Sequence, residues 1–155
     1  MSRLSLRPSQ AYVVTSWVAL ATGAVAFCIG LLNAAMMLNE KGYYLTVLAF
    51  GLFGVVSLQK SIRDRAEHVP TSSLYHSTCW LAVALAVSLL VIGLINASLT
   101  LSEKGFYGMA FALALFGAVT VQKNVRDLAL YEVLDPLAED VDVRIGGRTF
   151  REAKG

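Results

Sequence analysis

Four long apolar stretches alternate with short polar ones along the chain. No Asp, Glu, Lys, Arg or His occurs in residues 11–38, 43–58, 77–102 or 106–121. A membrane-spanning helix needs roughly 20 mainly apolar residues, with about 17 as the lower limit. Two of the stretches exceed this length and two lie near the limit. The pattern therefore predicts an all-α, polytopic membrane protein with four transmembrane helices.

The second half of this pattern repeats the first. A shift of 63 residues aligns 17–64 with 80–127 without a gap, and 22 of the 48 aligned pairs are identical. Two spans per copy return the chain to its starting side, so we expect parallel repeats of the same orientation. The predicted segments are an N-terminus (1–10), a first two-helix repeat (11–65), a linker (66–76), a second two-helix repeat (77–128) and a polar tail (129–155).

Basic residues cluster on one predicted side of the membrane. Of the 13 Lys and Arg residues, 11 lie in the N-terminus, the central connection and the C-terminal region, and Lys41 and Lys104 lie in the short polar stretches. Because cytoplasmic segments are enriched in Lys and Arg, both termini are predicted to be cytoplasmic. The short polar stretches should then lie at the outer interface.

Composition excludes several functional classes. Hydrophobic residues make up 56% of the chain and charged residues 15%, against about 25% charged in soluble domains. A net charge of +2 without a dense basic cluster argues against nucleic-acid binding. Cys28 and Cys79 are interpreted as packed small side chains, and His68 and His76 as interfacial groups without a third metal ligand. No cofactor or metal is predicted.

The two short polar stretches are interpreted as hairpin turns. Glu and Lys at the bilayer centre would cost about 3 kcal/mol each, so they are expected at the headgroup level. Glycine in each stretch would suit a helix C-terminus with positive φ. The charges either fix the depth of the hairpins, or the two acidic turns meet and bind a cation or a partner. The residues concerned are Glu40, Lys41, Gly42, Glu103, Lys104 and Gly105.

Asn33 and Asn96 are the main polar side chains within the spans. They are accompanied by Gly30 and Gly93, and the following spans carry Gly54 and Gly117. One interpretation is helix packing, with each Asn bonding across an interface at an average of about 0.6 kcal/mol. The alternative is a polar path or ligand site lined by the two Asn side chains.

A second duplicated motif ends each repeat on the predicted cytoplasmic side. Its Lys and Asp share a helix face at i,i+4, as do its Gln and Arg. We interpret this rim as an interfacial anchor attracted to anionic headgroups, with a docking surface for a cytoplasmic partner as the alternative. The rim residues are Gln59, Lys60, Arg63, Asp64, Gln122, Lys123, Arg126 and Asp127.

The tail carries a weaker signal than the spans. Residues 141–150 alternate apolar and polar side chains around two glycines, which favours a small hairpin. An isolated hairpin is marginally stable in water, so a flexible tail is an equal alternative.

Catalytic and transport chemistry lack the usual residues. No predicted span carries a mid-membrane carboxylate, Lys, Arg or His, which ion-coupled transporters and proton relays use. There is no Ser/His/Asp grouping, metal set or phosphate loop in the pattern. The sequence is therefore not expected to be that of an enzyme.

A family resemblance is carried by residues from Trp17 through the glutamate-lysine-glycine stretch to Asp64, and by their second copy as far as Asp127. With these residues the two repeats resemble the YiaA/YiaB family of bacterial inner-membrane proteins. Ser102 and Phe106 depart from the first copy, where Asn39 and Tyr43 stand. The resemblance implies a multi-pass protein of the bacterial inner membrane and implies no activity.

Three functional hypotheses follow. The first is a structural or interaction protein that acts through helix packing, with a role in stress as one option and with a homo-oligomer or another membrane protein as partner beside the lipid bilayer. The second is a small transporter or channel component that works as an oligomer. The third is an accessory subunit of a membrane enzyme.

Overall fold

The computed structural model describes residues 8–152, with side chains described for residues 8–134. This part of the chain forms four helices: α1 (Gln10–Asn33), α2 (Leu38–Ala66), α3 (Ser73–Asn96) and α4 (Leu101–Glu152). Each helix contains a stretch long and apolar enough to cross a membrane, and in α4 this stretch is Leu101–Leu134. The predicted all-α fold with four spans is confirmed.

The turns between the spans are shorter than the sequence indicated. Ala34 and Ala97 end α1 and α3 with extended backbone, and their amides donate to the carbonyls of Gly30 and Gly93 at 2.9 Å. Because α2 begins at Leu38 and α4 at Leu101, the polar stretches form the first helical turns after the connection. The interpretation of these stretches as the turns themselves was wrong by about one helical turn.

The central connection between the repeats consists of residues 67–72. Helix α2 ends at Ala66, before Pro70, and α3 begins at Ser73, within the stretch predicted as a linker. His68 adopts a positive φ of 57° in this connection.

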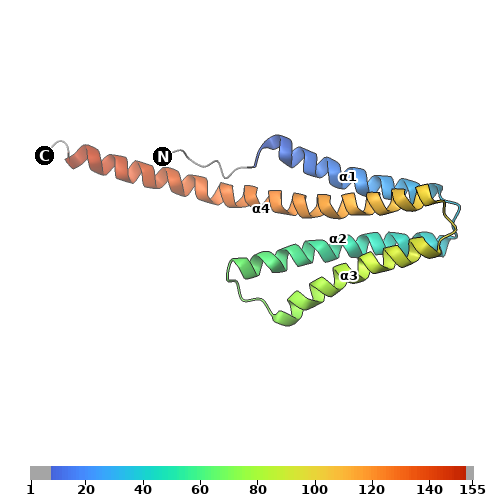
Figure 1. Cartoon of the computed structure of the whole chain (residues 1–155). Helices are drawn as coiled ribbons and strands as arrows, with labels where there is room; N and C mark the ends of the chain where they lie inside the picture. Colours follow the sequence, from blue (N-terminus) through green and yellow to red (C-terminus); the bar gives the residue numbers. More distant parts are fainter. Residues whose placement is uncertain (1–7, 153–155) are drawn as a thin grey trace.

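The tail differs from the prediction. Helix α4 continues through it to Glu152, beyond the other three helices (Figure 1). The expected hairpin at 141–150 and the flexible tail are both replaced by helix. Extending an existing helix adds one hydrogen bond per residue fixed, whereas a new element must first be nucleated.

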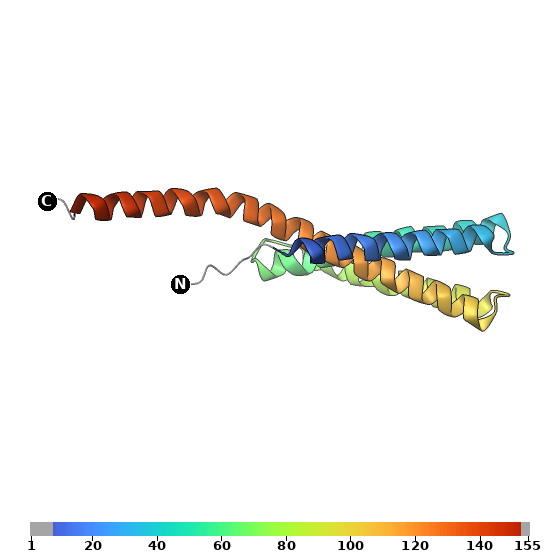
Figure 2. The same cartoon turned by 90° about the horizontal axis from the view of Figure 1, so that it is seen from above.

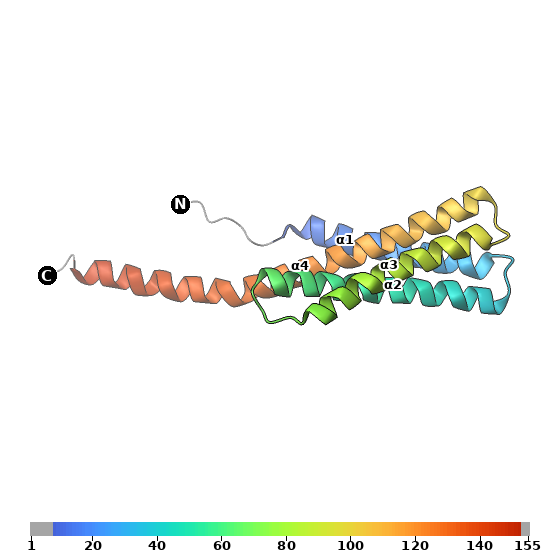
Figure 3. The same ribbon diagram turned by 60° about the horizontal axis from the view of Figure 1, so that its bottom comes forward.

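The helices pack across the repeats. Helix α1 lies mainly along α4, and α2 lies mainly along α3, while the two helices of each hairpin contact each other sparsely (Figure 1). The remaining major contact joins α2 to α4 at the centre, and Figure 3 shows the long α4 crossing the bundle. Because α1 corresponds to α3 and α2 to α4, this arrangement has an approximate twofold symmetry along the bundle, as parallel repeats require.

We call the end that holds residues 34–37 and 97–100 the turn end, and the opposite end the terminal end. From above, the two connections at the turn end lie apart from each other (Figure 2). Helix α1 begins, and α4 leaves the bundle, at the terminal end. That this end faces the cytoplasm stays a prediction.

Aromatic and small side chains from both repeats fill the core. Its buried residues include Phe27, Tyr44, Leu90, Tyr107 and Phe111. Close approach of α1 to α4 depends on small residues, as expected for helices packing in lipid, where hydrophobic driving force is absent. A Cβ at Gly23 would overlap the backbone of Ala114.

Candidate functional site at the turn end

The charged residues after each turn cap helix ends. The Glu40 carboxylate accepts a hydrogen bond from the Met37 amide through Oε2, at 2.8 Å, at the start of α2. Lys41 Nζ donates to the carbonyl of Leu32 at the end of α1, at 2.9 Å. Both charges therefore satisfy backbone groups that the helices leave without partners. Negative charge at a helix start and positive charge at a helix end also complement the helix dipole.

The second repeat builds the same turn with one addition. Glu103 Oε2 accepts from both the amide and the hydroxyl of Thr100, each at 2.8 Å. Lys104 Nζ donates to the carbonyl of Ile95 at 3.2 Å. The second carboxylate is thus more fully hydrogen-bonded than Glu40.

The turn glycines do not have the expected role. Gly42 and Gly105 lie inside the first turns of α2 and α4, and no glycine in the described residues has a positive φ. The expectation of a helix C-terminal glycine was wrong because the helix begins four residues before Gly42. A Cβ added at either position would meet no atom within 4 Å.

Aromatic rings meet where the two repeats face each other. Tyr44 and Tyr107 occupy equivalent positions, and their rings stack with centroids 6.2 Å apart and planes at 18°. Phe27 of α1 packs edge-on against Tyr107, at 5.3 Å between centroids. Gly30 and Gly93 make room for these rings: a Cβ on Gly30 would lie 2.7 Å from Phe106, and one on Gly93 would lie 2.8 Å from Tyr43.

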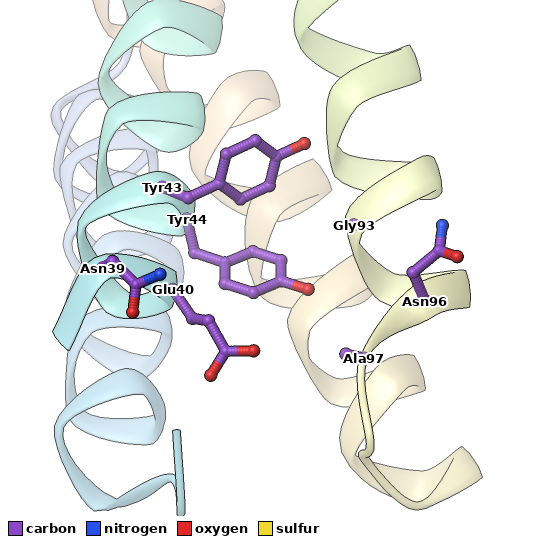
Figure 4. Close-up of a pocket in the computed structure, with 7 residues that line it drawn as sticks. All are labelled: Asn39, Glu40, Tyr43, Tyr44, Gly93, Asn96 and Ala97. Atoms are coloured by element: carbon purple, nitrogen blue, oxygen red, sulfur yellow. The ribbon is translucent and has the colours of Figure 1, made fainter. Parts of the chain in front are cut away.

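Two equivalent pockets flank this aromatic pair, each made by both repeats. The first has a volume of about 320 Å³ and lies between the start of α2 and the end of α3 (Figure 4). It is lined by Asn39, Glu40, Tyr43, Tyr44, Gly93, Asn96 and Ala97. The second has a volume of about 350 Å³ and lies between α4 and α1. It is lined by Gly30, Asn33, Ala34, Ser102, Glu103, Phe106 and Tyr107.

The pockets differ in one cross-helix bond. The Tyr43 hydroxyl donates to the carbonyl of Leu89 on α3 at 2.7 Å, which ties α2 to α3 beside the first pocket. Phe106 takes this position at the second pocket and has no hydroxyl. Glu40 and Glu103 thus line two separate pockets, and neither of these pockets contains both acidic turns.

Asn33 and Asn96 lie at the rims of these pockets, exposed, and outside the core. Each Nδ2 donates to the carbonyl four residues earlier in its own helix, Ile29 at 2.8 Å and Ile92 at 2.7 Å. In Figure 4 the Asn96 side chain points away from α2. Within the described part of the chain, these amide groups therefore donate to their own helices and not across a helix interface.

Gly54 and Gly117 lie in helix contacts rather than at the pockets. A Cβ at Gly117 would lie 2.5 Å from the Leu20 backbone nitrogen, whereas one at Gly54 would keep 3.4 Å from Val83. Close approach was expected at both positions, and it is pronounced at Gly117.

The terminal-end rim is a set of ion pairs. Lys60 and Asp64 pair at 3.4 Å and Lys123 and Asp127 at 2.8 Å, as the i,i+4 spacing indicated. Arg63 lies 3.7 Å from Asp64, and Arg126 pairs with Glu67 at the end of α2. These carboxylates compensate much of the basic charge available to anionic headgroups. Gln59 and Gln122 each bury a side-chain oxygen without a partner among the described residues.

Two polar contacts near this rim were not predicted. Asn124 is 1% exposed, and its Nδ2 donates to the Ser16 hydroxyl at 2.9 Å, joining α4 to α1. The equivalent Ser61 is hydrogen-bonded to Nδ1 of His76 on α3 at 3.0 Å. The alignment of the two repeats could have indicated these contacts, because both copies of the rim motif carry a polar residue at this position, Ser61 and Asn124.

Metal and redox chemistry have no assembled site in the part of the chain that the structure describes. No three His, Cys, Asp or Glu side chains there come together to hold a metal ion. Cys28 and Cys79 are free thiols. The arrangement at the turn end can accept positive charge and donate from phenols, but it assembles no nucleophile with a base.

These features define a polytopic membrane protein with two copies of a two-helix unit. The family model described as yiaA/B two helix domain matches residues 12–64 and 75–127, and the chain belongs to this family. It is 55% identical over 122 residues to inner membrane protein YiaA of Escherichia coli K12, covering 79% of this chain and 84% of the relative. No solved structure matches.

Two further relatives extend the comparison. Inner membrane protein YiaB of Escherichia coli K12 is 32% identical over 103 residues, 66% of this chain and 87% of the relative. The uncharacterized membrane protein YubF of Bacillus subtilis 168 is 38% identical over 68 residues, 43% of this chain and 78% of the relative. Together with the four spans, these relatives place the chain in the bacterial inner membrane as a multi-pass protein in contact with the lipid bilayer.

Proposed function

We propose that the protein is a non-catalytic interaction protein of the membrane, in which two-helix units associate with one another. A second copy of the chain is its partner, joined by exchange of repeats. The proposal rests on one observation: the two helices of each hairpin contact each other sparsely, and each packs mainly on the other repeat. A two-helix unit alone therefore leaves its core face uncovered.

The central contact makes the repeats interchangeable. Tyr44 and Tyr107 stack on each other from equivalent positions, and Gly30 and Gly93 accommodate equivalent rings. A repeat from a second copy presents the same groups at the same positions. Exchanging an identical element between copies is a low-cost route to dimers, because it needs no new interface.

The connection between the repeats supports exchange. Six residues, 67–72, separate α2 from α3, and fully extended they would span at most about 20 Å. That is enough to pass the second repeat to an adjacent copy. The Bacillus relative is also consistent, because 68 matched residues are 78% of it. It has room for one two-helix unit and is too short for the stretch 12–127 that both units occupy here.

The transport alternative has less support. Asn33 and Asn96 bond to their own helices at the rims of separate pockets, and aromatic side chains occupy the space between α2 and α4. A role in stress has no observation in its favour among the described residues.

A disulfide formed between two copies tests the proposal. In a Cys28→Ala, Cys79→Ala background, Ser16→Cys is placed on one tagged chain and Asn124→Cys on a second, since these side chains are in contact. Repeat exchange predicts a disulfide-linked dimer containing both tags in native membranes. Both substitutions on one chain should give an intramolecular disulfide, which reports correct folding.

Collisions in the membrane require a matched control. Val18 and Val125 are exposed and lie within two residues of Ser16 and Asn124 in the chain, so the pair Val18→Cys and Val125→Cys reports random encounters. A yield for the Ser16 and Asn124 pair no higher than this control, with the intramolecular disulfide intact, would refute repeat exchange.

A further inference from the structure

We propose that each turn-end pocket binds the phosphoethanolamine head of a membrane phospholipid. The pocket is built twice, with volumes of about 320 and 350 Å³, and in each case a carboxylate from one repeat faces the last turn of a helix from the other. Its chemistry does not depend on repeat exchange, because both repeats contribute to each pocket within a single chain.

A carboxylate oxygen is free to accept the ammonium group. Glu40 uses Oε2 to cap α2, and among the described residues its Oε1 accepts no hydrogen bond. No Lys or Arg lines either pocket. The ammonium group should therefore lie beside Glu40, with Lys104 already at the carbonyl end of α3.

A buried phenol supplies a donor for the phosphate. Tyr44 is 4% exposed and Tyr107 is 3% exposed, yet each lines its pocket. Neither hydroxyl has a hydrogen-bond partner within the described part of the chain, and Figure 4 shows that of Tyr44 directed into the gap between α2 and α3. These side chains are largely buried but line open pockets, so each hydroxyl is available to donate to a ligand. A phosphate oxygen would accept that hydrogen bond.

A lysine from the opposite repeat completes the charge pattern. Lys104 Nζ donates to the carbonyl of Ile95, which precedes the pocket-lining Asn96. An ammonium group has three donors, and this contact uses one of them. At the second pocket, Lys41 Nζ donates to the carbonyl of Leu32, which precedes the pocket-lining Asn33. Each site thus offers one negative and one positive group, which matches a zwitterion better than an anionic head.

The surroundings favour a lipid over a free solute. Ile92 and Ile95 are exposed on α3 beside the first pocket, as are Ile29 and Leu32 on α1 beside the second. These side chains would contact acyl chains while the head occupies the pocket. Phosphatidylcholine should bind less well, because its quaternary ammonium has no N–H to donate to the carboxylate.

Lipid retention by the full chain tests the inference. The protein is reconstituted in nanodiscs containing equal parts of phosphatidylethanolamine, phosphatidylglycerol and phosphatidylcholine, and the lipids that stay bound after release are identified by native mass spectrometry. We expect two phosphatidylethanolamine molecules per chain, retained in preference to the other two lipids. Equal retention of all three would overturn the proposal.

Two substitutions separate binding from folding. Glu40→Gln and Glu103→Gln remove the charge but keep an acceptor that can cap the helix, since Gln serves in capping boxes as Glu does. Each should lower phosphatidylethanolamine retention at its own pocket by about tenfold, as loss of a hydrogen bond to a charged group predicts. Glu132→Gln, an exposed carboxylate outside the pockets, should leave retention unchanged. Unchanged retention in the Glu40→Gln, Glu103→Gln double variant would refute the site.

Discussion

The α1–α4 pair and the α2–α3 pair are built from equivalent helices of the two repeats, yet they pack differently toward the terminal end. In α1–α4, Gly23 and Gly117 bring the two backbones together, and Asn124 bonds to Ser16 in a buried contact. Gly23 faces the backbone of Ala110, and the residues equivalent to this pair in α2–α3 are the larger Ala86 and Val47. Toward the turn end the two pairs share the pocket and the ring packing and differ in single hydrogen bonds, such as that of Tyr43 to Leu89. Divergence between the repeats is therefore larger toward the terminal end than toward the turn end.

The largest expected difference lies between Gly117→Ala and Gly54→Ala. The first forces a Cβ against the backbone of Leu20, which cannot yield without moving α1, whereas the second stays at ordinary contact distance from Val83. We expect Gly117→Ala to lower the free energy of unfolding by about 2–3 kcal/mol, as overpacking typically does, and Gly54→Ala by much less. Thermal or denaturant unfolding in detergent measures both, and equal losses would contradict the difference in packing.

The buried bond between Asn124 and Ser16 should have the next largest effect. Asn124→Ala also leaves a cavity, so we expect a loss of about 1–2 kcal/mol in unfolding free energy. A double-mutant cycle with Ser16→Ala isolates the bond itself, for which about 0.6 kcal/mol of coupling is expected. The same cycle on Ser61 and His76 provides the comparison for α2–α3. A coupling energy of zero for Asn124 and Ser16 would show that the bond contributes nothing.

Near the turn end we expect equivalent substitutions in the two repeats to cause similar losses of stability. Gly30→Ala and Gly93→Ala both push a Cβ against an aromatic side chain, at 2.7 and 2.8 Å. Because a ring can shift where a backbone cannot, we expect each to cost about 1 kcal/mol. Unfolding midpoints that differ clearly between the two variants would show that the symmetry breaks here as well.

The smallest effect is expected from the capping lysines. Lys41→Met and Lys104→Met keep most of the side-chain length and remove the donor to the carbonyl of Leu32 or Ile95. A charge at a helix end contributes about 0.3–1 kcal/mol and is screened by salt. Each variant should therefore lose a few tenths of a kcal/mol at low salt and less at high salt, as followed by unfolding. A loss that grows with salt would rule out an electrostatic origin.

The sequence was sufficient for the spans, the duplication and the ion pairs, because each depends on residues close together in the chain. Lys60 and Asp64, for example, pair through i,i+4 spacing alone. The packing of α1 on α4 and of α2 on α3 could not be predicted, because apolar residues surround a membrane helix on all sides and do not identify its neighbour. The pockets could not be predicted for the same reason. The sequence identified Glu40 as a candidate residue, but its position opposite the end of α3 depends on how the two repeats pack. The roles of Gly42 and the tail were misjudged from local pattern.

The sparse contact within each hairpin has a consequence for biogenesis. Among the four described helices α4 is synthesised after the other three, and it is the main partner of α1, which is synthesised before them. Individual spans insert before they associate, so α1 lies in the bilayer without its main partner until three more helices have been synthesised. A nascent chain that stops before Leu101 would lack Tyr107 and Phe111, the rings against which Phe27 packs. The main contacts of α1 can therefore form only after α4 has been inserted into the membrane.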